Sequence, residues 1–176
     1  MLAPVPDYFL RSARLGFRPW LAEDLPLALR LWGDPAVTRF ITRSGFTEAE
    51  IRARLERERA SQETLGIQYW PIFLLANGEH VGCCGLRPRA GHPRVPELGV
   101  HVLPCHWRRG YALEAASAVI DHAFGALGFE TLFAGHNPQN VASRILLSRL
   151  GFVHTHDEFY EPTGLEHPSY TLTRHR

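Results

Sequence analysis

The sequence has 176 residues and a formal net charge of +1, which argues against a protein held on nucleic acid or an anionic membrane by bulk electrostatics. Its 45% apolar and 21% charged residues are ordinary for one soluble globular domain, and neither a membrane-length apolar run nor an apolar signal core is present. Its three cysteines, two of them adjacent, argue against a disulfide scaffold, so we expect a cytoplasmic protein.

The first third of the chain is predicted to form one strand and two helices. Alternating apolar and polar residues indicate the strand over 13–21. A helical pattern follows over 23–32. The second helix, over 47–62, opens with Thr47 and Glu50, whose spacing is that of a capping box, and its few apolar residues predict that most of it faces water.

Three strands are predicted in the middle of the chain. Asn77-Gly78, the strongest short hairpin signal in the sequence, divides residues 67–88 into two strands. Pro71 lies in the first of them and predicts either a sheet edge or a bulge, because proline cannot donate to the ladder. A further strand is predicted over 96–104.

The last third alternates helices and strands. A long helix is predicted over 107–128, with Gly128 at its end, followed by a strand over 130–136. A second helix is predicted over 137–151, with Asn137 as its cap.

Two strands, over 152–160 and 169–176, close the chain. Residues 160–170 are predicted to be a loop between them, either an ordinary one or a wall of the acceptor site. The order of elements predicts a mixed α/β fold, with helices on both faces of one sheet.

The start of the long helix, "WRRGYALEA", has no Ser, Thr, Asp or Asn to cap its free amides. Such amides lie at the positive end of the helix dipole and suit a phosphate group. Arg108 and Arg109 add positive charge, and Gly110 allows a ligand to approach the backbone closely. An ordinary turn with solvated arginines explains the local pattern equally well. The pattern is neither a Walker loop nor a dinucleotide fingerprint.

Three segments in this order give the chain a resemblance to the GNAT superfamily of N-acetyltransferases, especially its ribosomal-protein branch. They are "ARLGFRPW" with the helix after it, "ELGVHVLP" with "HWRRGYALEA", and "NPQNVASRILLSRLGF". The resemblance covers nearly the whole chain. It implies a single N-acetyltransferase domain over 1–176 that uses acetyl-CoA. It also implies a mixed, mostly antiparallel sheet whose two central parallel strands splay apart.

The resemblance assigns cofactor contacts residue by residue. The main chain of Val100 and Val102 would pair with the pantetheine arm. The pyrophosphate would be held by the backbone of Arg108, Arg109, Gly110, Tyr111, Ala112 and Leu113. Leu113 departs from the family, since many relatives carry a hydroxyl there; that departure removes a side-chain contact and leaves the backbone amides.

Acetyl transfer to an amine needs a base for the amine proton, a donor to the thioester oxygen and an acid for the leaving thiolate. Glu97 is the first candidate for the base, because it resembles the acidic residue that several family members use. Strand alternation places Glu97, Gly99 and His101 on one face. His101 and His136 are competing bases. An ordinary strand-end charge, or histidines satisfied within the sheet, are the alternatives.

Asn140 and Ser143 lie three residues apart on the predicted last helix and so share a face. In the branch that this chain resembles, the matching Asn contacts the cofactor and the matching Ser is a candidate to protonate the thiolate. The tyrosine that other members use for this step matches Leu147, so that route is closed here. A plain surface hydroxyl at Ser143 is an equal alternative, and a backbone amide near Val102 is expected to polarise the thioester.

The remaining expectations concern partners and metals. No metal is expected, because the spacing of the candidate ligands is not that of a zinc site; those ligands are His80, Cys83, Cys84, His101, Cys105 and His106. We expect a primary amine as acceptor, on a protein N-terminus or a small molecule, and neither nucleic acid nor membrane as partner. The chain is expected to be a monomer or homodimer. A non-catalytic CoA-binding sensor or interaction module is the alternative function; Leu147 leaves room for it, and Glu97 with Ser143 argues against it.

Overall fold

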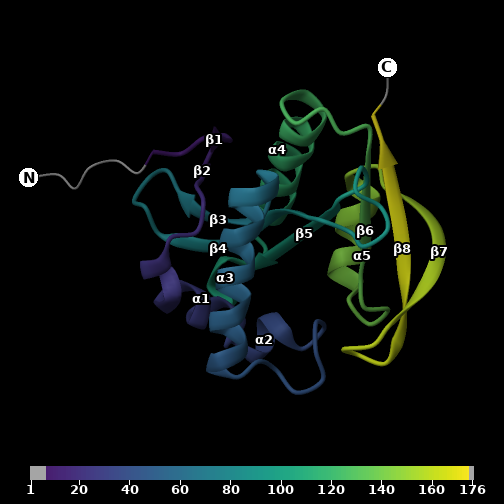
Figure 1. The fold of residues 1–176 in the computed structure, drawn as a ribbon, viewed down its shortest axis with the longest axis horizontal. Helices are drawn as coiled ribbons and strands as arrows, with labels where there is room; N and C mark the ends of the chain where they lie inside the picture. The colour runs from purple at the N-terminus through teal and green to yellow at the C-terminus, as the bar shows by residue number, and fades with distance from the viewer. Residues whose placement is uncertain (1–6, 175–176) are drawn as a thin grey trace, which may run out of the picture.

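The computed structural model describes residues 7–174 as one eight-stranded sheet with helices on both faces (Figure 1). The spatial order of the strands is β1-β2-β3-β4-β5-β6-β8-β7. All neighbours are antiparallel except β5 and β6, which confirms the predicted mixed fold. The strands are β1 (Leu10–Arg11), β2 (Leu15–Phe17), β3 (Tyr69–Leu74), β4 (His80–Arg87), β5 (Glu97–Val102), β6 (Thr131–Gly135), β7 (Val153–Tyr160) and β8 (Leu165–Thr173).

Two apolar cores hold the helices on the sheet. One lies under α1 and α3 and contains the buried Trp32, Ile51 and Leu55. The other lies under α4 and α5 and contains Val119 and Leu147. The helical elements are η1 (Ala22–Asp24), α1 (Leu25–Trp32), α2 (Pro35–Thr38), α3 (Glu48–Leu65), η2 (Pro104–His106), α4 (Tyr111–Gly125) and α5 (Val141–Arg149).

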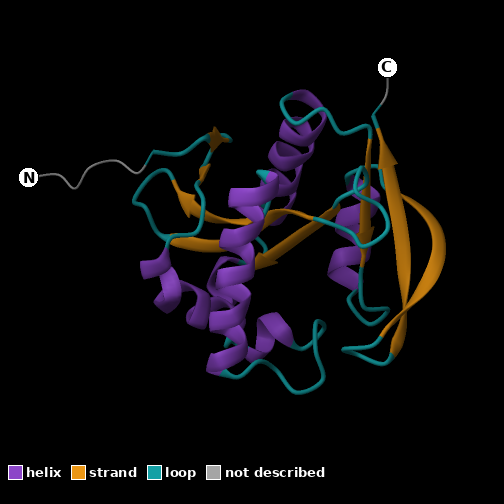
Figure 2. Cartoon of the chain, in the orientation of Figure 1, coloured by secondary structure: helices purple, strands orange, loops and turns teal. Residues whose placement is uncertain are grey.

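The parallel strands β5 and β6 separate soon after they begin. Their ladder contains one pair, Glu97 opposite Phe133, together with a 2.9 Å hydrogen bond from the Phe133 amide to the Pro96 carbonyl. Beyond that pair the strands diverge, and Figure 2 shows β6, β7 and β8 standing at a steep angle to β3, β4 and β5. The predicted splay between the two central strands is therefore confirmed.

Local signals placed several element ends correctly. Thr47 and Glu50 form the predicted capping box at the start of α3, with the Thr47 amide 2.7 Å from a Glu50 carboxylate oxygen. Asn77 and Gly78 form the turn between β3 and β4, and Gly78 has a φ of 73°. A register shift one residue after Pro71, between Ile72 and Phe73, confirms the bulge.

The predicted helix starts need correction. α4 begins at Tyr111 rather than 107, because η2 and a turn containing Arg108, at φ 59°, precede it. It ends at Gly125, three residues before Gly128. α5 begins at Val141, and its cap is Asn140 rather than Asn137. The Asn137 side chain instead accepts a 2.9 Å hydrogen bond from the Gln139 amide, which makes a separate turn before the helix.

The predicted loop over 160–170 is wrong for most of its length. β8 already begins at Leu165, so only four residues connect it to β7. Gly164, at φ 68°, closes this short turn. Pro168 lies within β8 and is tolerated because its main chain faces β6, whose ladder ends one residue away, at Ser169.

Two further properties of the described residues concern the apolar character of the helices and the state of the cysteines. Among residues 7–174, no helix combines the length and apolar character that crossing a bilayer demands. Cys83 and Cys84 are buried free thiols, and Cys105 is an exposed one. The two adjacent cysteines face opposite cores, as strand alternation predicts.

Burial of His80 between Trp20 and Phe73 makes the fold sensitive to acid. Burial lowers the pKa of His80 from 6.5 to about 4. Between these values the unfolded chain binds the proton and the folded chain does not, so stability falls as pH falls. His80 alone contributes about 1.4 kcal/mol per pH unit to this slope. Urea unfolding between pH 7 and pH 4 should show a shallower slope for His80→Gln than for the wild type. His154→Gln, at an exposed histidine, is the control, and an unchanged slope in His80→Gln would contradict the assignment.

Candidate cofactor and acceptor site

A cavity of about 910 Å³ lies where β5 and β6 diverge and is bordered by the starts of α4 and α5. It brings together residues from eleven of the helices and strands given above. Every predicted site residue lines it except Arg109. A volume in this range accommodates an extended ligand and leaves room for a second small molecule. The Arg109 side chain is exposed outside the cavity lining, and the predicted role of its backbone stays a prediction.

The start of α4 presents its backbone amides without a side-chain cap. Gly110 occupies the cap position at φ 81°, and no side-chain hydrogen bond is made there. The first helical backbone bond runs from the Glu114 amide to the Gly110 carbonyl. The amides of the first turn therefore remain available to a ligand, as we expected from the lack of a capping residue in the sequence.

Arg14 and Glu114 stabilise the start of α4 through contacts outside the cavity lining. Neither residue was predicted from the sequence. An Arg14 nitrogen donates to the Arg109 carbonyl at 3.1 Å, and the two side chains form an ion pair at 2.7 Å. The Ser12 hydroxyl donates to the same Glu114 carboxylate at 2.7 Å. About 100 residues separate these partners, so no local pattern signals them.

Two residues of β5 direct their backbone N–H and C=O groups into the gap that opens between β5 and β6. The Leu103 amide bonds the Val81 carbonyl at 2.9 Å, which fixes the phase of the antiparallel ladder. Alternation along that ladder directs the N–H and C=O groups of Val100 and Val102 away from β4. Trp107 takes up part of this edge, because its indole N–H donates to the Val102 carbonyl at 2.7 Å. The other groups can pair with a linear amide-bearing ligand.

Glu97, Gly99 and His101 share the face of β5 that is turned toward α1 and α3. The ring of Tyr69 occupies the space beside Gly99, where any side chain would overlap it. The half-buried Glu97 side chain lines the cavity and makes no ion pair within residues 7–174. Burial raises the pKa of the Glu97 carboxyl above its ordinary value, and Arg87 and Arg89 oppose that rise. A carboxylate with a raised pKa is a suitable general base.

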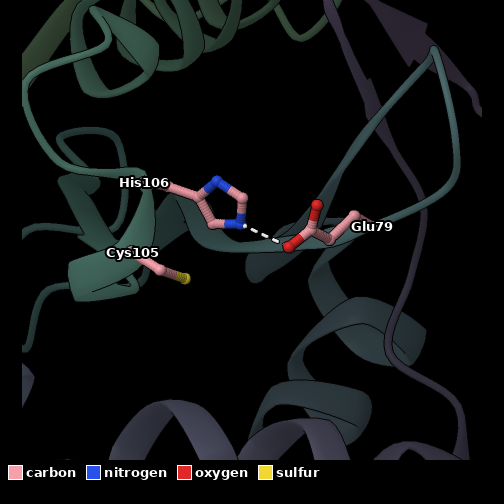
Figure 3. Close-up of side chains that lie close together, drawn as sticks. All are labelled: Glu79, Cys105 and His106. Carbon is pink, nitrogen blue, oxygen red and sulfur yellow. Dashed lines mark ion pairs between the residues drawn. The ribbon is translucent and has the colours of Figure 1, made fainter.

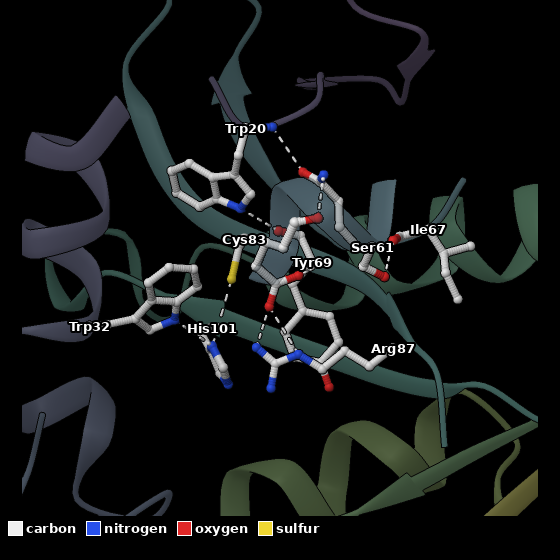
Figure 4. Close-up of polar contacts among 10 residues, drawn as sticks. Trp20, Trp32, Ser61, Ile67, Tyr69, Cys83, Arg87 and His101 are labelled. Atoms are coloured by element: carbon white, nitrogen blue, oxygen red, sulfur yellow. Dashed lines mark hydrogen bonds and ion pairs between the residues drawn. The ribbon is translucent and has the colours of Figure 1, made fainter. Parts of the chain in front are cut away.

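His101 is oriented as a hydrogen-bond donor rather than as a base. The Trp32 indole N–H lies 3.2 Å from Nδ1 of His101, and Cys83 Sγ lies 3.6 Å from the same atom (Figure 4). An indole can only donate, so Nδ1 accepts and Nε2 carries the proton. Burial lowers the pKa of His101 well below its ordinary value, so the ring stays neutral. Its free N–H is suited to contacting an oxygen in the cavity.

His136 has protein partners at both ring nitrogens. Nδ1 lies 2.8 Å from the Asn137 carbonyl, and Nε2 lies 3.2 Å from the Tyr170 hydroxyl. The ring also stacks on Tyr170 with a centroid separation of 5.4 Å. This arrangement matches a histidine satisfied within the sheet, so Glu97 is the better candidate for the base.

The start of α5 places Asn140 and Ser143 in the cavity wall. Asn140 caps the helix, and its side-chain oxygen accepts from the Ser143 amide at 3.1 Å. Asn140 thus precedes the helix rather than sharing a helical face with Ser143, and its amide nitrogen remains free to contact a ligand. Leu147 is buried in the core one turn further on, where no hydroxyl is present.

Among residues 7–174, one group of three possible metal ligands is found, and it contains two of the six histidines and cysteines considered above. Glu79, Cys105 and His106 have ligand atoms within 4.8 Å of one another (Figure 3). His106 Nε2 lies 3.3 Å from a Glu79 carboxylate oxygen, and Arg30 donates to Cys105 Sγ at 3.8 Å. Neither ring nitrogen of the buried His106 has a hydrogen-bond partner within residues 7–174. The absence of a metal stays a prediction.

An uncapped helix start beside a strand with an unpaired edge is a site for an extended, phosphate-bearing ligand. A family model for the acetyltransferase (GNAT) domain matches residues 14–153. The chain therefore belongs to the GNAT family of acetyltransferases, whose acetyl donor is acetyl-CoA. This confirms the resemblance drawn from the sequence.

Individual relatives agree with this assignment. The uncharacterized N-acetyltransferase YoaA of Bacillus subtilis is 30% identical over 145 residues, which cover 81% of each chain. RimJ of Mycobacterium smegmatis, solved in complex with CoA-disulfide, has a TM-score of 0.76 at 20% identity, covering 90% of this chain and 81% of that one. A ribosomal-protein-S5-alanine acetyltransferase from Vibrio fischeri has a TM-score of 0.73 at 16% identity, covering 96% and 97%. At these identities the two structures show a shared fold.

Proposed function

We propose that this protein transfers the acetyl group of acetyl-CoA directly to a primary amine, without a covalent enzyme intermediate. The observation that carries the proposal is the continuity of one cavity from the uncapped start of α4, along β5, to Glu97. The solved RimJ complex with CoA-disulfide supports a CoA ligand on this fold. The amine substrate is the expected partner, and neither nucleic acid nor a membrane is needed.

Each chemical requirement has a residue in the cavity wall. Glu97 accepts a proton from the incoming ammonium, which frees the nitrogen lone pair for attack on the thioester carbonyl carbon. The Val102 amide donates to the carbonyl oxygen as negative charge develops there. After attack, the nitrogen gives up its second proton to solvent; when the carbon–sulfur bond breaks, the Ser143 hydroxyl gives its proton to the leaving sulfur, and solvent returns a proton to Ser143.

The role of Ser143 is tested by Ser143→Ala. We expect kcat to fall about tenfold, because the thiolate then leaves without an acid. The Kd of CoA should stay within about twofold of the wild type, because the Ser143 amide and the Asn140 cap remain. Stopped-flow detection of free thiol measures kcat, and Ser148→Ala, on the same helix and outside the cavity lining, is the control. Full kcat in Ser143→Ala would assign this hydroxyl to the helix surface.

The proposal as a whole is tested by thiol release from acetyl-CoA in the presence of a panel of primary amines. Steady release that depends on the amine, with an acetylated product of matching mass, supports direct transfer. Tight CoA binding with no release across the panel would instead support a CoA-binding module that has lost the chemistry.

A further inference from the structure

The cavity is lined by six arginines and two glutamates, and most of the charges near Glu97 are paired. The Arg89 guanidinium pairs with Glu158 at 3.0 Å. Arg87 pairs with Glu58, which lies behind the cavity wall, through a hydrogen bond of 2.9 Å from its Nε and a second contact from its terminal nitrogen. Figure 4 shows Arg87 against the ring of Tyr69, and its guanidinium lies 4.0 Å from the ring centroid.

Arg54 is the buried arginine of the cavity lining that forms no ion pair within the described part of the chain, and Glu97 forms none either; the other unpaired arginines of the lining, Arg39, Arg108 and Arg149, are exposed. Arg54 exposes 7% of its surface, and its guanidinium lies 4.7 Å from the ring centroid of Trp32 and 5.3 Å from that of Phe46. Its Nε has no hydrogen-bond partner, and no carboxylate of residues 7–174 lies within ion-pair distance. A buried charge normally has a partner, because desolvation without compensation is unfavourable.

The local sequence offers Arg54 a partner that is already engaged. Glu58 lies four residues further along α3, at the spacing that normally forms an ion pair on a helix. Its carboxylate is bound by Arg87 and by the Tyr69 amide, the latter at 2.7 Å. Other arginines of α3, Arg52 and Arg59, do form such helical pairs. Arg54 therefore lines the cavity beside two aromatic rings and has no acidic partner.

We infer that the acceptor is a zwitterion, whose amine lies at Glu97 and whose carboxylate is bound by Arg54. This inference rests on the proposed transferase function. An acceptor of this kind supplies a cation for Glu97 and an anion for the buried Arg54. A guanidinium can bind a carboxylate through two parallel hydrogen bonds, which fixes the orientation of the amine as well. A free amino acid and a peptide N-terminus with a nearby acidic side chain share this chemistry.

The test compares acceptors that differ only in the carboxylate. Thiol release is measured for amino acids against their carboxamides, and for tripeptides with Asp against Asn at the second or third position. In the wild type we expect kcat/KM to favour the carboxylate form about tenfold or more in one of the two series, and that series identifies the source. Equal rates for carboxylate and carboxamide in both series would overturn the inference.

The variants locate the preference. Arg54→Gln should reduce the carboxylate preference to about twofold or less, and Arg54→Lys should keep part of it, since an ammonium retains the charge without the fork. Arg57→Gln, at an exposed position on the same helix, should keep the wild-type preference. A full preference in Arg54→Gln would overturn the assignment. Because the wild-type comparison needs no variant, poor folding of Arg54→Gln would not prevent a decision.

A binding measurement separates this inference from the proposed function. With CoA present, the favoured carboxylate amine should raise the Tm of the wild type more than its carboxamide does, and this difference should vanish in Arg54→Gln. Such a difference without thiol release would support the anion site and contradict the transferase function. Thiol release with amines but no carboxylate preference would support the transferase and overturn the anion site.

Discussion

Glu97→Gln should lower kcat at neutral pH by more than about tenfold, because the amide cannot accept the ammonium proton. The substitution keeps the shape of the side chain, and Glu97 lies at the opposite end of β5 from the start of α4. The Kd of CoA should therefore stay within about twofold of the wild type. Thiol-release kinetics and calorimetric titration measure the two quantities on the same preparation. Glu166→Gln, at an exposed position of β8, is the matched control.

The pH dependence of the same variant makes the prediction sharper. Glu97 works as a base in its ionised form, and burial raises the pKa of its carboxyl above the ordinary value of 4.5. Wild-type kcat should therefore fall as pH falls through this raised pKa, with the loss beginning at a higher pH than an exposed glutamate would give. Glu97→Gln should lack that acidic limb. Normal turnover at neutral pH, or an unchanged acidic limb, would assign the base to another group.

Elements of the fold defined by local chemistry could be predicted from the sequence. The capping box of Thr47 with Glu50 and the turn at Asn77-Gly78 satisfy backbone groups within a few residues, so their outcome depends little on the rest of the chain. The cap of α5 shows the limit. Asn137 and Asn140 are both suitable helix caps by their residue type. The Asn137 side chain forms a separate turn with the Gln139 amide, so Asn140 becomes the cap of α5. The hairpin at Gly164 was missed because the strand geometry around Pro168 depends on where β6 ends.

The residues of the site likewise divide into those that the sequence could indicate and those that only the tertiary structure shows. Residues near the start of α4 were recognisable because a helix without a cap has a local signature, and the family resemblance added Glu97 and Ser143. Arg54 was not recognised, because the charged sequence of α3 predicts a helix that mostly faces water. Its burial follows from the packing of Trp32 and Phe46 around it, and its lack of a partner follows from the capture of Glu58 by Arg87. Both are tertiary facts, so no sequence spacing encodes them.

Gly110→Ala should raise the Kd of CoA about tenfold or more, because it disturbs the helix start that we assign to the pyrophosphate. An added methyl group would lie in the loop that borders the cavity, 3.4 Å from an Arg14 nitrogen. The φ of 81° is also unfavourable for alanine, by about 1 kcal/mol, so relaxation would turn the first amides of α4 away from the ligand. Calorimetric titration with CoA measures the effect.

Gly128→Ala separates the loss of a phosphate site from simple backbone strain. Gly128 has a φ of 72°, has nothing within 4 Å of an added Cβ, and lies outside the cavity lining. Both variants should lose a similar free energy of unfolding, about 1 kcal/mol, while Gly128→Ala keeps wild-type affinity for CoA. Pantetheine, which lacks the pyrophosphate, should bind the wild type and Gly110→Ala equally. If Gly110→Ala weakens pantetheine as much as CoA, the amides of α4 do not hold the pyrophosphate, because the lost contact must then lie along β5.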